Sequence, residues 1–235
     1  MEKYFDATYI LQSIPMLLPF LKVTFMVACL SILFGTIIGF ILAAAKLGKS
    51  KIARNLANGY ITILRCTPSI VLLFLVYYGI PAIGNNLGMN LNDIDKAVFV
   101  IVTFSLQFGA LMCEVIRSAY ESIDKGQFEA AVSVGLSNIQ AYGRIIFPQA
   151  FVVALPNFGN SLLALLQEGA LAYTIGLIDI VGKANLIIAS NYNAHALEIF
   201  LALSIIYWVI SIAIEHFFLK LERAFSKGKQ SLKAL

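Results

Sequence analysis

Five stretches of the chain contain no charged side chain over 16 to 27 residues, and they constrain the fold more than any other feature. They are residues 23–45, 66–92, 97–113, 145–167 and 199–214. A helix rises about 1.5 Å per residue, so about 20 apolar residues cross a hydrocarbon core of about 30 Å. Backbone N–H and C=O groups inside lipid must pair within their own segment, which favours helices over strands. The sequence therefore predicts an all-α polytopic membrane protein with five transmembrane helices.

Two segments at the edges of these stretches, residues 81–92 and 8–20, differ from them in composition. Residues 81–92 are rich in Gly and Asn, so we expect a loop at the end of the second stretch. Residues 8–20, which contain Pro15 and Pro19, precede the first stretch. Two alternatives remain open for them: an amphipathic helix on the outer membrane surface, or an irregular lead-in.

Composition excludes a soluble globule. Charged residues make up 13% of the 235 residues and hydrophobic residues 60%, whereas a soluble domain has about 25% charged residues. The three cysteines lie in or beside apolar stretches. An odd number in such places favours packing residues over a disulfide framework.

Lys and Arg are distributed unevenly among the connections. Of the 17 in the chain, thirteen follow the first, third and fifth stretches, and four lie near the N-terminus or in the other connections. Short cytoplasmic connections of membrane proteins are enriched in Lys and Arg. We therefore predict that the N-terminus is outside and the C-terminus is in the cytoplasm.

The longest cytoplasmic connection, residues 117–147, has a helical pattern. Phe128, Ala131 and Val132 have helical spacing, and Gly135 stands where a short helix would end, because Gly adopts left-handed dihedrals without steric cost. Ser137 or Asn138 could cap a second short helix. The sequence predicts a helix-turn-helix between the third and fourth spans, suited to the groove of a partner protein.

A family resemblance begins in this connection. Gly126-Gln127-Phe128-Glu129-Ala130-Ala131, then Gly135, then Phe147-Pro148-Gln149-Ala150 resembles the EAA loop of permease subunits of polar amino-acid ABC importers. Further matches are Arg65-Cys66-Thr67-Pro68 upstream and Ala172-Tyr173-Thr174-Ile175-Gly176 downstream. The resemblance covers about residues 20 to 220, and it rests on the order and spacing of the motifs.

The resemblance implies a single transmembrane domain over residues 1–235, in a bacterial cytoplasmic membrane, with a coupling loop at about 117–147. The implied partners are a pair of cytoplasmic ABC ATPases, a second permease subunit that is identical or paralogous, and an extracytoplasmic amino-acid-binding protein. No nucleic acid is expected. ATP would be bound by the ATPase, and we expect no cofactor in this chain. The implied cargo is a polar amino acid. The resemblance is strongest to importers of cystine and other sulfur-containing amino acids, on the segments Leu64-Arg65-Cys66 and Tyr77-Tyr78-Gly79-Ile80-Pro81.

The same resemblance assigns ATPase coupling to a set of residues in the loop. They are Gln127, Phe128, Glu129, Ala130, Ala131 and Gly135. For Glu129 the alternative is a solvated residue on a surface helix. Glu114 and Arg117 precede the loop at i and i+3 on one helix face. They form a local ion pair there, or Glu114 helps to gate the inner mouth.

Polar residues at membrane depth are costly and usually face protein or a water-filled cavity. The candidates for a substrate path are Thr67, Pro68, Gln107, Asn160, Gln167 and Glu168. Interhelical packing is the alternative for Thr67, Gln107 and Asn160, and a solvated position at the outer leaflet is the alternative for Glu168. Two departures from the family bear on this path. Cys66 replaces the usual Gly, and Gln167-Glu168-Gly169-Ala170 stands where Lys-Asp-Thr-Ser is common.

Enzymatic activity has no support in the sequence. Gly48-Lys49-Ser50 matches the end of a phosphate-binding loop, but residue 43 is Ala where that motif requires Gly, and no strand precedes it. Asp93 and Asp95 have no further carboxylate nearby in sequence, and His195 is far from His216. We expect no catalytic residue and no metal site. Of the rival classes, a membrane enzyme would need a catalytic cluster, and an ion channel would not explain the helix-turn-helix.

Overall fold

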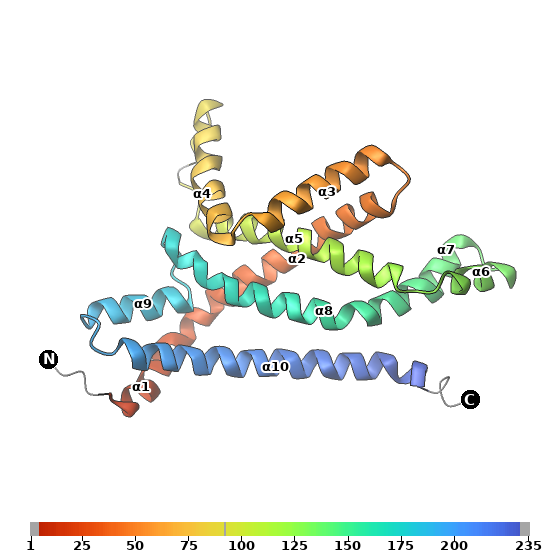
Figure 1. Ribbon diagram of the computed structural model, residues 1–235. Helices are drawn as coiled ribbons and strands as arrows, with labels where there is room; N and C mark the ends of the chain where they lie inside the picture. The colour runs from red at the N-terminus through yellow and green to blue at the C-terminus, as the bar shows by residue number, and fades with distance from the viewer. Residues whose placement is uncertain (1–4, 92, 231–235) are drawn as a thin grey trace.

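The computed structural model describes residues 5–91 and 93–230, and every element within those ranges is helical. Four long helices form the body of the molecule; in Figure 1 the last two follow its long axis, and the first crosses it obliquely. They are α2 (Leu21–Leu47), α5 (Lys96–Glu121), α8 (Phe147–Glu168) and α10 (Ala196–Gln230). The all-α prediction is confirmed.

Shorter elements connect these helices. The α-helices are α1 (Ala7–Leu17), α3 (Lys51–Cys66), α4 (Ser69–Asn86), α6 (Lys125–Ser133), α7 (Asn138–Ala141) and α9 (Ile180–Ser190). Two 3₁₀ segments are η1 (Leu18–Phe20) and η3 (Gly169–Ile175), and η2 (Tyr142–Ile146) is a π-helical turn. The helices α1 and α9 lie at one end of the molecule, and α6 and α7 lie at the other (Figure 1).

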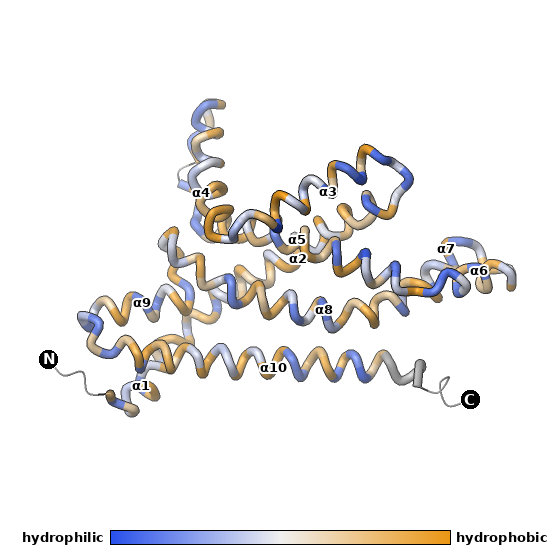
Figure 2. Tube along the Cα trace, viewed as in Figure 1, coloured by the Kyte–Doolittle hydropathy of each residue, from blue (hydrophilic) through white to orange (hydrophobic). Residues whose placement is uncertain are grey.

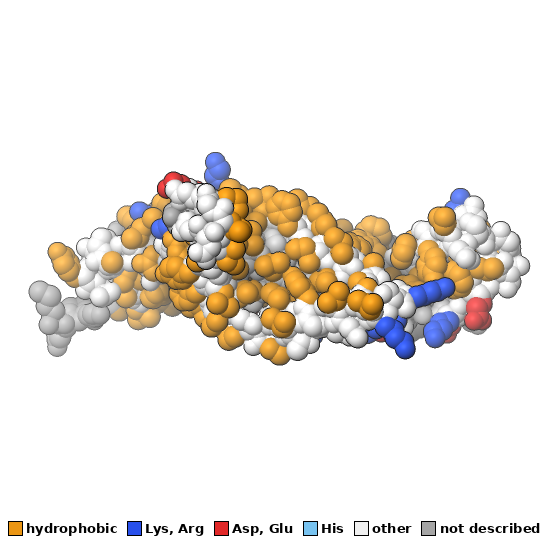
Figure 3. Space-filling model, turned by 90° about the horizontal axis from the view of Figure 1, so that it is seen from above, with side chains coloured by type: hydrophobic (Ala, Val, Ile, Leu, Met, Phe, Trp, Pro, Cys, Tyr) orange, Lys and Arg blue, Asp and Glu red, His pale blue; other side chains and the backbone are white. Residues whose placement is uncertain are grey.

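Five segments of the described residues are long and apolar enough to cross a membrane, which confirms the predicted number. They are Ala7–Leu47, Ser69–Asn86, Lys96–Glu121, Asn138–Ile175 and Ala196–Phe225. Figure 2 shows that apolar residues predominate along them. In the view of Figure 3, apolar side chains cover the middle of the surface, and most charged side chains lie toward the two ends. Such a surface is expected where lipid surrounds the middle of a protein.

The core of the bundle is the contact between α2 and α5. A Cβ atom added at Gly39 would lie 2.5 Å from Met112 Cβ, and one added at Gly109 would lie 2.5 Å from Ile38 Cγ2. Small residues allow two helix backbones in a membrane to approach closely. The close approach of α2 and α5 therefore depends on glycine from both helices.

An ion network joins the same two helices nearer to the α6–α7 end. Lys46 Nζ of α2 lies 2.6 Å from Glu114 Oε1, and Arg117 Nη2 lies 2.8 Å from Glu114 Oε2. The expected local pair of Glu114 and Arg117 is therefore present, and Lys46 extends it across the helix contact. Because α5 continues to Glu121, the first five residues of the connection that the sequence placed at 117–147 belong to this helix.

The second span differs from its prediction. A helix, α3, occupies residues that the sequence indicated as a charged connection, and it meets α4 at a break over Thr67 and Pro68. Pro68 has no N–H and disfavours helical dihedrals at the residue before it, and Thr67 is extended (φ −89°, ψ 124°). The helix α4 continues to Asn86, so the predicted loop at 81–92 was wrong in its first half.

Residues 8–20 are helical, which excludes the irregular lead-in, whereas the position of this helix on the outer membrane surface stays a prediction. Asp6 caps α1 by accepting a hydrogen bond from the Thr8 N–H at 2.8 Å. Leu17 is fully buried, in one apolar cluster with residues of α9 and α10, whereas Leu11 is exposed. The helix α9 was not predicted from the sequence.

Candidate functional site

A cavity of about 380 Å³ lies at the break between α3 and α4. Its lining combines the end of α3, the start of α4, the middle of α5 and the end of α8. The lining residues are Leu64, Arg65, Cys66, Thr67, Pro68, Ser69, Gln107, Leu111 and Glu168. Since Gln107 is near the midpoint of α5, the cavity lies halfway along a membrane-spanning helix.

Ser69 links three helices within this cavity. Gln107 Nε2 of α5 donates to Ser69 Oγ of α4 at 3.1 Å, and the Ser69 hydroxyl is also a hydrogen-bond partner of the Glu168 carboxylate of α8. Gln107 Oε1 is buried and has no hydrogen-bond partner among the described residues. A buried amide oxygen without a partner is costly, so the hydrogen-bonding capacity of Gln107 is only partly used by Ser69.

Two opposite charges line the same cavity. Arg65 is exposed and Glu168 is half-buried, and neither forms an ion pair within the described part of the chain. A guanidinium binds carboxylates, and a carboxylate binds ammonium groups. The lining can therefore hold a small molecule that has both groups, as a free amino acid does.

The structure brings together four of the six residues expected on a substrate path: Thr67, Pro68, Gln107 and Glu168. Gln167 is exposed and does not line the cavity. Asn160 lines a separate pocket, between α8 and α10, beside Glu215.

The sequence analysis missed the roles of Arg65 and Ser69 as lining residues. Ser69 follows the Thr67-Pro68 break directly, and Arg65 precedes it by two residues. The signal available for them was that break itself, since side chains on either side of a broken span face a shared space.

The α5–α8 connection forms the helix-turn-helix that the sequence predicted. Gly135 has φ +91°, its N–H donates to Val132 O at 2.9 Å, and the Leu136 N–H donates to Ala131 O at 3.2 Å. This pair of bonds is a Schellman motif, which ends a helix at a left-handed residue. Ser137 then caps α7 in a reciprocal capping box with Gln140.

The outer surface of this connection is apolar as well as charged. Val134 is 80% exposed and Ile139 is 85% exposed, and both flank the turn at Gly135. Gln127, Glu129 and Ala130 are also exposed. We call Glu129, Val132, Val134 and Ile139 the loop surface; exposed apolar groups of this kind commonly mark a binding site for a partner.

Phe128 and Ala131 face the rest of the chain instead. Ala131 is buried, and the Phe128 ring lies 5.0 Å from the ring of Tyr142. The Tyr142 ring also lies 6.4 Å from that of Tyr120 in α5 and 5.8 Å from that of Phe147 in α8. Tyr142 thus connects α6 to two spanning helices, from a π-helical turn of the kind often found at functional sites.

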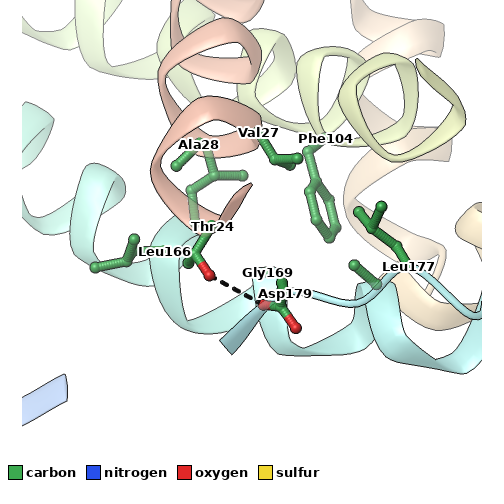
Figure 4. Close-up of a pocket in the computed structure, with 10 residues that line it drawn as sticks. Thr24, Val27, Ala28, Phe104, Leu166, Gly169, Leu177 and Asp179 are labelled. Carbon is green, nitrogen blue, oxygen red and sulfur yellow. Dashed lines mark hydrogen bonds between the residues drawn. The ribbon is translucent and has the colours of Figure 1, made fainter. Parts of the chain in front are cut away.

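A buried acid lies near the opposite end of the molecule. Asp179 caps α9 by accepting from the Gly182 N–H at 2.8 Å, and Thr24 Oγ1 of α2 donates to its other oxygen at 3.3 Å (Figure 4). Burial raises the pKa of this carboxyl above its usual range. The adjoining cavity of about 10 Å³ has room for about one water molecule and no amino acid. This group therefore holds α9 against α2 and is separate from the cavity at the α3–α4 break.

Comparison with known proteins gives consistent matches along the chain. The family model described as binding-protein-dependent transport system inner membrane component matches residues 35–227. The L-cystine transport system permease protein TcyL of Bacillus subtilis (strain 168) is 40% identical over 229 residues, which are 97% of this chain and 95% of the relative. The histidine/lysine/arginine/ornithine transport system permease protein HisQ of Salmonella typhimurium is 32% identical over 210 residues, covering 88% and 91%.

A solved structure is similar over nearly the same length. It is described as the crystal structure of an amino acid ABC transporter with histidines, and it matches with a TM-score of 0.81 and 28% identity, covering 94% of this chain and 99% of the other. The MetNI methionine ABC transporter in an inward-facing conformation matches at a TM-score of 0.65 and 17% identity, covering 93% and 96%, which supports the fold alone.

Proposed function

The chain belongs to the family of binding-protein-dependent transport system inner membrane components, and on that premise we propose that the cavity at the α3–α4 break is the cargo site of its import path. The chain is the permease subunit of an amino-acid ABC importer. The observation that supports the site is the presence of Arg65 and Glu168, unpaired within the described residues, on one cavity at the middle of the spans. Arg65 binds the cargo carboxylate, and Glu168 binds its ammonium group.

The cargo in this proposal is cystine or a related sulfur-containing amino acid. Support comes from the 40% identity to an L-cystine permease over almost the whole of both chains. A cavity of about 380 Å³ is within the size range of sites for small molecules.

The proposed assembly has a pair of cytoplasmic ABC ATPases, a second permease that is identical or paralogous, and an extracytoplasmic binding protein. We place it in a bacterial cytoplasmic membrane, with α6 and α7 on the cytoplasmic side, because Lys and Arg gather in the connections at that end. ATP binds to the ATPase subunits. The loop surface is the part of this chain that docks on them.

The loop surface couples ATP hydrolysis to the spans through Tyr142. Glu129 and Val134 face outward to the ATPase, while Phe128 on the same helix packs on Tyr142. Because Tyr142 also contacts Tyr120 and Phe147, a displacement of α6 moves the ends of α5 and α8 together. These two helices contribute Gln107 and Glu168 to the cavity.

Uptake of labelled amino acids by cells that express the complete importer tests this function. Cystine uptake should require this chain, and unlabelled cystine should compete better than arginine or histidine. An equally expressed system that imports a different amino acid and ignores cystine would contradict the cargo assignment. An importer that retains cystine uptake after both Arg65→Gln and Glu168→Gln would contradict the site.

A further inference from the structure

The helix α3 has three distinct faces along its length. At about 100° per residue, Ala53, Ala57, Tyr60, Ile61 and Leu64 share one face, and all of them are buried or half-buried. Ile61 belongs to an apolar cluster with Ala43 of α2 and Ala110 of α5. This face fixes α3 against the bundle.

A second face is apolar and points away from the bundle. We call it the apolar face: Ile52, Leu56 and Ile63, which are 75%, 71% and 64% exposed. Gly59 lies between them, and a Cβ atom added there would meet nothing within 4 Å. Side chains of this type are compatible with lipid or with an apolar partner.

The third face is polar over its whole length. We call it the polar face: Asn55, Asn58, Thr62 and Arg65, spaced at i, i+3, i+7 and i+10, and every one is exposed. The polar residues on α3 are visible in Figure 2, in contrast to the apolar α2 beneath it. No Asp or Glu occurs between Lys51 and Cys66.

The depth of α3 excludes a position on the membrane surface. The Tyr60 hydroxyl donates to the carbonyl oxygen of Leu106 at 2.9 Å, and Leu106 is near the middle of α5. Asn58 and Thr62 flank Tyr60 on the helix and are therefore at the depth of a spanning segment. Amide and hydroxyl side chains at that depth are costly unless they face protein or water.

The polar face also ends at the cargo cavity. Arg65 belongs to both, and Cys66 and Thr67 continue the cavity lining. In the other direction α3 begins at Lys51. Only three residues separate it from α2, whose Lys46–Glu114 ion pair lies toward the α6–α7 end. A continuous row of polar side chains thus connects the cavity at mid-depth with one end of the molecule.

We infer that the polar face of α3 lines the inner half of the import path, so that cargo leaves the cavity past Thr62, Asn58 and Asn55. This rests on the proposed function. Neutral amide and hydroxyl groups exchange hydrogen bonds with a passing zwitterion without binding it tightly. The basic side chains at both ends, with no acid between them, favour a cargo that presents its carboxylate and disfavour a cargo with net positive charge.

Thiol labelling of the assembled complex in lipid nanodiscs tests this inference. The background chain carries Cys29→Ala and Cys113→Ala, and it must retain uptake. Cys66 is kept because it lines the cargo cavity, and its labelling in this background alone is measured and subtracted. Single variants Asn58→Cys and Thr62→Cys are compared with Leu56→Cys and Ile63→Cys on the apolar face, using a charged, lipid-insoluble thiol reagent. Only the thiolate reacts, and an apolar environment suppresses it, so polar-face cysteines should react about tenfold faster or more. Saturating cargo should slow that reaction.

Two results of the labelling experiment would overturn the inference. One is equal labelling of the two faces. The other is a disulfide between two copies at Asn58→Cys with no labelling, which would make the polar face a contact between permeases. Uptake separates these outcomes from a failure of the proposed function. Asn58→Leu should reduce cargo uptake severalfold, whereas Ile63→Leu should not. If Glu168→Gln loses uptake but Asn58→Leu does not, the cavity is still supported as the cargo site and the polar face is excluded as the path.

Discussion

At the scale of single residues, Glu168 is the most direct test of the cavity. Glu168→Gln preserves the size of the side chain and its ability to accept a hydrogen bond from Ser69, but it removes the charge that would hold an ammonium group. A partly dehydrated charge contact is screened less than an exposed one, so we expect cargo uptake to fall while the amount of assembled complex is unchanged. The matched control is Gln167→Ala, because Gln167 is exposed and outside the cavity lining. Equal uptake by both variants and the parent would make Glu168 a solvated residue.

Gly39 gives a residue-scale prediction about stability. Gly39→Ala would place its Cβ 2.5 Å from Met112 Cβ in the α2–α5 contact, and overpacking typically costs about 1–3 kcal/mol. The control is Gly59→Ala on α3, where nothing lies within 4 Å. Thermal unfolding in detergent should show a lower midpoint for Gly39→Ala alone. A midpoint equal to that of the control would show that the two helices separate at little cost.

Asp179 gives a residue-scale prediction about pH. Its pKa is raised in the folded chain by burial, so the folded state binds more protons than the unfolded state at pH values above the ordinary range for Asp. Stability that depends on this group is therefore present at acid pH and is lost as the pH rises through the raised pKa. Asp179→Asn can still accept the Gly182 hydrogen bond, so its unfolding midpoint should vary less between acid and neutral pH. Parallel pH profiles for parent and variant would contradict this account.

At the scale of elements, the turn between α6 and α7 has one residue that backbone geometry restricts. Gly135→Val forces a β-branched residue to φ +91°, at a cost of about 1–3 kcal/mol. We expect weaker coupling between ATP hydrolysis and uptake, measured in reconstituted vesicles. Gly143→Ala is the control, because Gly143 has open space and no positive φ. Unchanged coupling in Gly135→Val would show that the turn does not transmit the motion.

The loop surface supports a second prediction at this scale. Glu129 is exposed and forms no ion pair among the described residues, so reversing its charge leaves the fold of α6 intact. At a desolvated contact, a like-charge pair costs several kcal/mol. Glu129→Lys should therefore lose the ATPase during purification, whereas Asp93→Lys, the same charge reversal at an exposed residue between α4 and α5, serves as the control. Normal ATPase recovery and normal uptake from Glu129→Lys would exclude the docking role.

At the scale of the whole molecule, the orientation of the chain in the membrane can be tested directly. The distribution of Lys and Arg predicts that α6, α7 and the end of α10 are in the cytoplasm. A phosphatase reporter that is active only outside the cytoplasm should be active when fused after Gly88, between α4 and α5, and inactive when fused after Gln230. The reverse pattern would place α9 in the cytoplasm and α6 and α7 outside. It would contradict the proposed direction of transport.

All five candidate spans could be predicted from uncharged runs alone, because lipid excludes charge along a whole helix. The same count failed for α3, since Lys51, Arg54 and the polar face resemble a loop when hydropathy is the only criterion. It also failed for α9, whose 11 residues are too short to span. The cavity is a tertiary feature. Gln107 and Glu168 were recognised singly as polar residues in apolar runs, but Ser69, which joins them, has no unusual sequence context.

The break at Thr67 and Pro68 can link the binding of cargo to the binding of nucleotide. Pro68 has no N–H to donate to Leu64 O, so α3 can tilt relative to α4 without losing a helical hydrogen bond. Arg65 and Ser69 lie on opposite sides of this joint, so any tilt changes the distance between Arg65 and the other side chains that line the proposed cargo site. The affinity for cargo then differs between the two tilts. If nucleotide binding favours one tilt, it changes the affinity for cargo by some factor, and by linkage cargo changes the affinity for nucleotide by the same factor. Nucleotide binding to the ATPases should weaken cargo binding here by the same ratio by which cargo weakens nucleotide binding.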